Sequence, residues 1–140
     1  MRDLTAEDLD LIAVARRAIA ARYRPDWHVV GAALRTRAGR VFTGVHLEAN
    51  VGRIAVCAEA VALGRAATEA GDTDVDTIVA VYHPAAGEPD QTPQVVAPCG
   101  MCRELIADYA AEARVLVPGA DGSLEARPIA ALIPGKYTRP

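Results

Sequence analysis

The chain has 140 residues, a formal net charge of −3 at pH 7 and 4% aromatic residues. That length is enough to bury a single core, so we expect residues 1–140 to form one domain. The negative charge and the scarcity of aromatic rings exclude a surface for nucleic acid, and no apolar run is long enough to cross a membrane.

A helix is predicted at the start of the chain, followed by a hairpin. Thr5 provides a hydroxyl cap before an acidic first turn, and Pro25 ends the helix. Residues 28–36 and 40–46 are apolar and rich in β-branched side chains, which predicts two strands with a turn at Ala38-Gly39. The apolar residues that recur at helical spacing before Pro25 are Ile12, Ala15, Ile19 and Tyr23.

Two further helices are predicted to begin at cysteines. The first runs from Cys57 to Gly71, and the second covers residues 99–111. Short strands are expected at 77–82, 114–117 and 122–127, while prolines and a glycine predict a long loop at 83–98. The side chains expected to face inward from the last helix are Leu105, Ile106 and Tyr109.

Strands and helices alternate between residues 40 and 117, which predicts a pair of crossover connections. Right-handed crossovers place both helices on one face of the sheet, with their N-termini near the carboxyl ends of strands. Cys57 and Cys99 should therefore meet, although they are distant in sequence. Cys102 lies three residues after Cys99 and should share its helix face.

All three cysteines of the chain lie in two short motifs, Cys57-Ala58-Glu59 and Pro98-Cys99-Gly100-Met101-Cys102. Three thiolates on Zn²⁺ keep one coordination position open for water, and a nearby carboxylate can move that water's protons. The motifs therefore predict a catalytic zinc site, with Cys57, Cys99 and Cys102 as metal ligands and Glu59 as the catalytic acid and base.

Two other interpretations of the cysteines are weaker. A redox Cys-x-x-Cys pair would leave Cys57 and Glu59 without a role. A non-catalytic, zinc-stabilised domain needs a fourth ligand, for which a histidine such as His46 is the candidate, but such a site has no use for Glu59. Arg103 either offsets part of the negative charge of the three thiolates or is an ordinary solvated side chain.

The cysteines also indicate the cellular compartment of the protein. An odd number of cysteines does not suggest a disulfide framework, and thiolates that hold zinc need reducing conditions. Residues 1–5 are too acidic and polar for a signal peptide. We therefore expect a cytoplasmic protein.

The two cysteine motifs resemble those of the small cytidine deaminase family, and residues 35–45 and 132–137 resemble its hairpin and closing segment. The resemblance implies a three-layer α/β/α fold around a mixed five-stranded sheet, a bound Zn²⁺ and a homotetramer whose neighbours complete each site. It further implies that Glu59 protonates the ring nitrogen of the substrate and then passes a proton to the departing ammonia.

The resemblance implies a small aminated pyrimidine nucleoside as partner, with cytidine or deoxycytidine converted to the uracil form. His46-Leu47-Glu48 stands where the family has a ribose-binding Asn-x-Glu, and Ala58 and Tyr137 match further positions at the substrate site. His28 replaces a phenylalanine that packs on the pyrimidine, and in this the chain is similar to blasticidin S deaminases. A nucleoside antibiotic of that type is the alternative substrate, and purely structural roles for His28 and His46 remain open.

Overall fold

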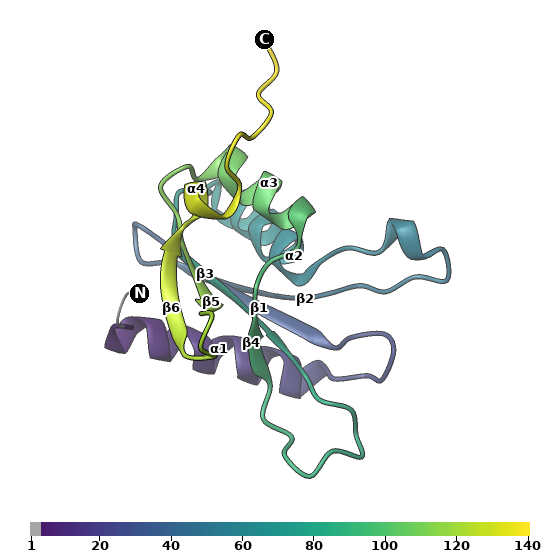
Figure 1. Ribbon diagram of the computed structural model, residues 1–140. Coiled ribbons are helices and arrows are strands. Elements are labelled where there is room, and N and C mark those ends of the chain that lie inside the picture. Colours follow the sequence, from purple (N-terminus) through teal and green to yellow (C-terminus); the bar gives the residue numbers. More distant parts are fainter. Residues whose placement is uncertain (1–3) are drawn as a thin grey trace.

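The computed structural model describes residues 4–140, so the first three residues of the segment considered as a signal peptide lie outside it. Helices and strands alternate along most of the chain (Figure 1). In order they are α1 (Ala6–Arg22), β1 (Val30–Thr36), β2 (Val41–Val45), η1 (Gly52–Ile54), α2 (Ala58–Arg65), η2 (Ala66–Ala70), β3 (Val75–Tyr82), β4 (Gln94–Val96), α3 (Gly100–Tyr109), β5 (Arg114–Pro118), β6 (Leu124–Pro128) and α4 (Ile129–Leu132).

The architecture is the expected three-layer α/β/α arrangement. One mixed sheet runs in the order β2-β1-β3-β5-β6, with β3 and β5 parallel and the other pairs antiparallel. Helix α1 covers one face of the sheet, while α2 and α3 cover the other (Figure 1). The five strands of this path match the expected number, and β4 adds a sixth by pairing with β3.

Alternating side chains on β1 explain why both faces of the sheet carry a core. Ala32 and Leu34 belong to the apolar cluster beneath α2 and α3, whereas Ala33 belongs to the cluster beneath α1. Glycine is needed where β2 meets α2, because a Cβ on Gly44 would lie 2.6 Å from the backbone oxygen of Ala58. Close contact between β2 and the first turn of α2 thus sets the height of α2 above the sheet.

The ends of α1 agree with the sequence prediction in part. Thr5 and Asp8 form a capping box, because the amide of each donates to the side chain of the other. The helix ends at Arg22, before Pro25, and Tyr23 lies just beyond it. The Tyr23 ring stacks on His83 with a centroid separation of 3.7 Å, which joins the end of α1 to the end of β3.

Two expectations about the second half of the chain are wrong. Residues 94–96 lie in strand β4, although 83–98 was expected to be a loop, because Val95 and Val96 pair with Val81 and Ala80 of β3. Tyr109 faces outward with 56% of its surface exposed. The buried row follows i, i+4 spacing through Cys102 and Ile106 of α3 to its C-cap residue Ala110, and Tyr109 lies one residue, about 100°, away from this row.

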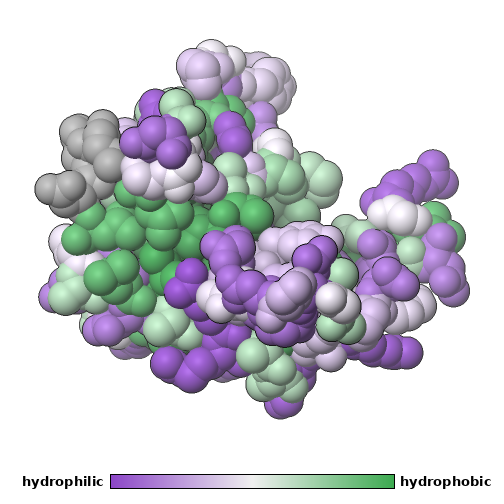
Figure 2. All heavy atoms as spheres, turned by 60° about the horizontal axis from the view of Figure 1, so that its bottom comes forward, coloured by the Kyte–Doolittle hydropathy of each residue, from purple (hydrophilic) through white to green (hydrophobic). Residues whose placement is uncertain are grey.

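The α1 side of the molecule presents a mixed surface. Hydrophobic residues gather across one part of this face, and hydrophilic residues surround them (Figure 2). Within residues 4–140, none of the helices combines the length and the apolar character required to cross a membrane.

Candidate functional site

The three cysteines meet at the N-termini of α2 and α3. Cys57 is the N-cap residue of α2, Cys99 is the N-cap residue of α3, and Cys102 is buried in the first turn of α3. Their sulfur atoms all lie within 4.8 Å of one another, and the Sγ atoms of Cys57 and Cys99 are 3.5 Å apart. In the part of the chain that the structure describes, this is the one group able to hold a metal ion, and it contains no histidine.

The geometry of the sulfur atoms fits zinc. Zn–S bonds of about 2.3 Å in a tetrahedral site put neighbouring sulfurs about 3.8 Å apart. The 3.5 Å between the sulfur atoms of Cys57 and Cys99 is close to this value, and three cysteine ligands leave a fourth position for water. Partial positive charge at the two helix N-termini offsets some of the charge on the thiolates.

The pKa shifts of the three thiols also indicate that a cation is needed to keep all three deprotonated. Burial raises the pKa of Cys57 and of Cys102, and the negative charges of Glu59 and of the neighbouring thiols add to the effect. Burial acts in the same direction on Cys99, but hydrogen bonds from the backbone amides of Cys102 and Met101 and from Cys57 outweigh it and lower its pKa. Of the three thiols, Cys99 therefore loses its proton most readily, and three thiolates together need a positive ion between them.

Glu59 is buried beside the sulfur atoms, in the first turn of α2. Only 6% of its surface is exposed. Burial raises the pKa of its carboxyl, while a hydrogen bond from its own backbone amide and one from the Cys102 thiol oppose the rise. A carboxyl with a raised pKa can hold and release a proton closer to neutral pH than an exposed glutamate can.

A cavity of about 210 Å³ opens onto Glu59 and onto two of the three cysteines, Cys57 and Cys99. Its wall is mostly apolar, and the polar side chains on it are Glu59, His46 and the thiols of Cys57 and Cys99. The remaining residues of the wall are Val30, Ala55, Val56, Ala58, Val96 and Ala97. Small apolar side chains of this kind leave room for a flat, compact ligand.

His46 is held firmly at the end of β2. The backbone N–H groups of Val29 and Val30 donate to its Nδ1 at 2.9 and 3.1 Å. Nδ1 of His28 donates to the backbone oxygen of His46 at 2.9 Å, since a carbonyl oxygen can only accept. Burial lowers the pKa of His46, and the nearby Glu48 carboxylate opposes this shift.

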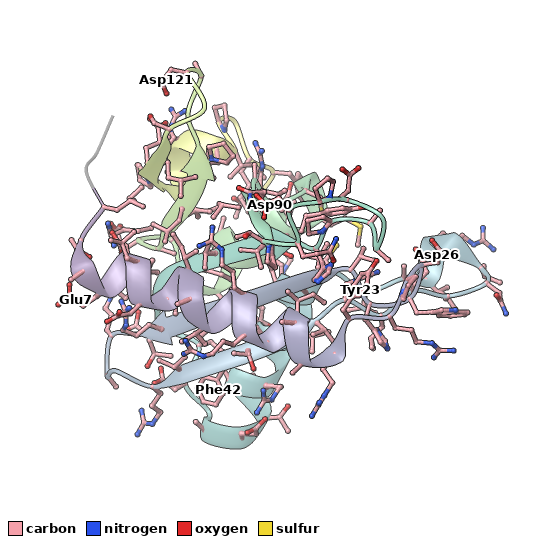
Figure 3. All side chains as sticks on the ribbon, turned by 90° about the horizontal axis from the view of Figure 1, so that it is seen from below. Glu7, Tyr23, Asp26, Phe42, Asp90 and Asp121 are labelled. Carbon is pink, nitrogen blue, oxygen red and sulfur yellow. The ribbon has the colours of Figure 1, made fainter. Side chains whose placement is uncertain are left out.

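Residues 23–28 lead into the site through a tight turn. Arg24 and His28 form an isolated bridge, and Asp26 between them has a φ of 65°. Figure 3 shows Tyr23 and Asp26 at one end of the molecule, with Glu7 at the opposite end of α1. The segment 46–56, which contains η1, projects from the body of the protein at the same end as Asp26 (Figures 1 and 3).

The predicted substrate residues are only partly brought together. Ala58 and His46 line the cavity, but His28, Glu48 and Tyr137 are not part of its wall. His28 contacts His46, and Glu48 is exposed two residues further along the chain. Tyr137 is 72% exposed in the C-terminal tail, where Lys136 forms ion pairs with Glu104 and Asp108.

Arg103 has a positioning role that neither sequence interpretation described. Its Nε donates to the backbone oxygen of Pro98 at 2.8 Å, and its Nη1 donates to the backbone oxygen of Leu132 at 3.0 Å. The side chain thus ties the residue before Cys99 to the end of α4. It holds the start of α3 in place and is not an ordinary solvated arginine.

Apart from Ala58, the apolar wall of the cavity was not predicted from the sequence. Val96 and Ala97 lie on β4 or directly after it, in a segment expected to be a loop. Ala55 and Val56 come from the projecting segment before Cys57. The one signal in the sequence was the short apolar run 95–97, which its flanking prolines obscured.

Comparisons with known proteins agree with this geometry. A sequence model of the cytidine and deoxycytidylate deaminase zinc-binding region matches residues 5–117. The chain is 49% identical over 137 residues to blasticidin-S deaminase of Bacillus cereus, covering 98% of this chain and 96% of the relative. It is 33% identical over 110 residues to cytidine deaminase of Halalkalibacterium halodurans, covering 78% of this chain and 76% of that relative.

The fold comparison points the same way. The crystal structure of cytidine deaminase from Mycobacterium leprae matches with a TM-score of 0.71 and 27% identity, covering 94% of this chain and 99% of that one. Fold, cysteine cluster and sequence similarity together show that the chain belongs to the family of the cytidine and deoxycytidylate deaminase zinc-binding region.

Proposed function

We propose that the protein hydrolytically deaminates the cytosine ring of a nucleoside, cytidine or deoxycytidine, to the uracil form with release of ammonia. The observation that carries the proposal is the position of Glu59. Its buried carboxyl shares one cavity with two of the three clustered cysteines. A site that only stabilised the fold would have no use for an acid there, and no histidine of residues 4–140 joins the metal-binding group to close it.

The metal ligands and the acid–base residue would have separate roles in this reaction. Cys57, Cys99 and Cys102 would hold the zinc, which supplies a Lewis acid and an activated water when bound. Glu59 would protonate the ring nitrogen of cytosine and later deliver a proton to the departing amine. Its raised pKa suits a group that must both take up and release a proton.

The cavity supports a nucleoside in preference to a nucleotide. Its volume of about 210 Å³ and its apolar wall suit an uncharged, flat base. Among the described residues 4–140, no lysine or arginine lines it, whereas phosphate binding usually relies on such cations. The sugar would lie toward the mouth, near His46 and Glu48.

A blasticidin S-type nucleoside antibiotic is the second candidate substrate. The 49% identity to a blasticidin-S deaminase over nearly the whole chain favours it. So do His28 and His46, because both stand where the nucleoside-specific pattern has other residues. Both candidates use the same acid and the same metal ligands.

Assembly and location complete the proposal. We infer a homotetramer in which the exposed Tyr137 contributes to a neighbouring subunit's cavity, because Tyr137 lies away from the cavity of its own chain. We also infer a cytoplasmic location. The Cys99 thiol is exposed, and it would be vulnerable to oxidation outside a reducing compartment.

A substrate panel tests the function. Zinc-loaded protein is incubated with cytidine, deoxycytidine, cytosine, deoxycytidylate, adenosine and blasticidin S, and ammonia release is measured for each. We expect turnover of a cytosine nucleoside and little turnover of deoxycytidylate or adenosine. Release of ammonia from none of them would refute the proposal, and a preference for blasticidin S would select the second candidate.

A further inference from the structure

A second groove lies next to the catalytic cavity. It has a volume of about 740 Å³ and is formed by the end of β3, strand β4 and the loop between them. Val96 of β4 lines both the cavity and this groove. The wall of the groove also includes Tyr82, Glu88, Asp90 and Gln94, and we call it the side groove.

The pairing of the strands continues the floor of the cavity into the side groove. Side chains of a strand alternate between the two faces of a sheet, so Gln94 lies on the same face as Val96, about 7 Å further along β4. Tyr82 pairs with Gln94 on one side and with Val30, which lines the cavity, on the other. Paired residues share a face. The side groove therefore adjoins the cavity at two places, at Val96 and beside Val30.

The loop that forms the outer wall of the side groove is held by its own hydrogen bonds. The side-chain amide of Gln91 donates to the backbone oxygens of Ala85 and Glu88 at 2.9 and 2.8 Å. The backbone amide of Glu88 also donates to the oxygen of Ala85. Arg16 of α1 fixes the end of the loop by donating to the backbone oxygen of Pro93. The wall is thus formed in the absence of a ligand.

The side groove carries negative charge. Glu88 and Asp90 are exposed, and within residues 4–140 neither forms an ion pair. Hydrogen bonds from Thr92 lower the pKa of Asp90, and the charge of Arg16 acts in the same direction, so this carboxyl is ionised at neutral pH. Among the described residues, no lysine, arginine or histidine lines the side groove.

An aromatic ring lies beside these carboxylates. Tyr82 is 49% exposed and lines the side groove together with Glu88 and Asp90. The face of such a ring attracts a cation, and a planar guanidinium can stack on the ring while it donates to a carboxylate. The chemistry of the side groove therefore matches a positively charged ligand.

We propose that the side groove binds a positively charged side group on the sugar of the substrate while the cytosine ring occupies the catalytic cavity. A guanidinium group fits best. This inference rests on the proposed function and adds a substrate class to it, cytosine nucleosides that carry a cation beyond the sugar. Cytidine has no such group, whereas blasticidin S carries a guanidinium at the end of a flexible acyl chain.

A variant without the two charges tests the subsite by kinetics. In Glu88→Gln/Asp90→Asn, the ratio of kcat/KM for blasticidin S to that for cytidine should fall about 5- to 10-fold, because two exposed charge contacts are lost. The change should lie in KM for blasticidin S, since neither residue touches the reacting atoms. The control Glu7→Gln/Glu112→Gln removes two exposed charges outside the side groove and should keep the ratio. An unchanged ratio in the first variant, or an equal fall in the control, would refute the proposal.

A pair of variants tests the aromatic ring separately. Tyr82→Phe keeps the ring and should keep the ratio, whereas Tyr82→Leu should lower it about 2- to 5-fold, the usual effect of one exposed cation–π contact. Melting temperatures show whether either variant has a folding defect. Equal ratios for Phe and Leu at this position would refute the contact between the ring and the cation.

Ionic strength gives a further measurement. The preference of the wild type for blasticidin S should weaken as sodium chloride is added, because salt screens contacts between exposed charges. The ratio for Glu88→Gln/Asp90→Asn should respond less. Equal salt dependence of the two proteins would contradict a charge contact in the side groove.

Binding measured without turnover separates this proposal from the proposed function. Zinc-loaded Glu59→Gln protein is titrated with blasticidin S and with cytidine by calorimetry, with and without the changes at Glu88 and Asp90. We expect the two changes to raise Kd about 5- to 10-fold for blasticidin S and to leave Kd for cytidine as it was. Failure of blasticidin S to bind, or equal changes in Kd for both compounds, would refute the subsite.

The outcomes are distinct. If the wild type releases no ammonia from any cytosine compound but the difference in Kd is found, the proposed reaction fails and the cation subsite stands. If ammonia is released and the difference is absent, the proposed function stands and the subsite is refuted. If the changes at Glu88 and Asp90 weaken self-association in analytical ultracentrifugation without altering the ratio, the side groove is an interface between copies of the chain, and the proposal is refuted.

Discussion

Both carboxylate oxygens of Asp8 accept hydrogen bonds from the guanidinium group of Arg114, each at 2.9 Å. The two residues are far apart in sequence, and the pair joins the first turn of α1 to strand β5 of the sheet. Asp8 is fully buried and also forms part of the capping box with Thr5. The same guanidinium donates to the hydroxyl of Thr77 on β3, so one side chain connects three elements.

Removing the charge of Asp8 should destabilise the fold. Asp8→Asn is expected to lower the free energy of unfolding by about 2–3 kcal/mol, less than for a fully buried pair because Arg114 is partly exposed. Urea unfolding measures the loss. Asp10→Asn, an exposed change in the same helix, should cost little, and equal effects from the two variants would contradict the role of the pair.

The same pair predicts how stability depends on pH. Hydrogen bonds from Arg114 lower the pKa of Asp8, with burial opposing. Its carboxyl therefore takes up a proton at higher pH in the unfolded chain, and its stabilising contribution is lost as the pH falls below about 4. In the Asp8→Asn variant, the free energy of unfolding should decrease less as the pH falls through this range. An unchanged decrease would show that other groups cause it.

Cys102→Ala should remove both metal and stability, because metal binding is coupled to folding at such sites. Zinc content per subunit and the thermal melting temperature are the measurements. Met101→Ala is the matched control, since Met101 precedes Cys102 in the same helical turn and is 74% exposed. Full zinc occupancy in Cys102→Ala would remove this residue from the ligand set.

Glu59→Gln should keep zinc and fold but lose turnover. One positioned acid–base group contributes about 10²–10⁴-fold, and a residue that serves two proton transfers should lie near the upper end. Zinc content and circular dichroism establish that the variant is intact before kcat is compared. A decrease of less than about tenfold would exclude Glu59 from the proton transfers.

Glu48→Ala tests recognition of the sugar. If the carboxylate accepts from ribose hydroxyls, its loss should lower kcat/KM for cytidine by about 10- to 100-fold, as expected for a charge-assisted hydrogen bond. Turnover of cytosine, which has no sugar, should remain nearly constant. A parallel decrease for both compounds would mean that Glu48 supports the fold or the metal site.

The C-terminal tail should link assembly with substrate binding. A chain that ends at Gly135 lacks Lys136, with its ion pairs to Glu104 and Asp108, and Tyr137. It should keep zinc but show a raised KM and weaker association by analytical ultracentrifugation. A chain that ends at Thr138 retains both residues and serves as the control. Identical KM and mass for the two truncations would refute a role for Tyr137.

The sequence could predict those features that depend on local chemistry. The cap at Thr5 and the helix starts at Cys57 and Cys99 follow from short-range patterns, and the crossover rule brings the cysteines together. Residues 94–96 were missed because their strand state depends on pairing with β3 and not on their own propensity. The contacts of Arg103 and His46 could not be predicted for a similar reason, because their partners are backbone groups of distant segments.

Because strand β4 pairs with β3 directly after the preceding loop, the position of the metal site should not depend on the length of that loop. The chain leaves β3 at Tyr82 and returns to pair Gln94 with that same residue, so residues 83–93 begin and end at one point of the sheet. Arg16 on α1 also fixes the return by donating to the backbone oxygen of Pro93. Insertions or deletions within 84–92 should therefore leave Cys99 where it is, which makes this loop the place where related chains can differ in length, or where a label can be inserted, at little cost to the site.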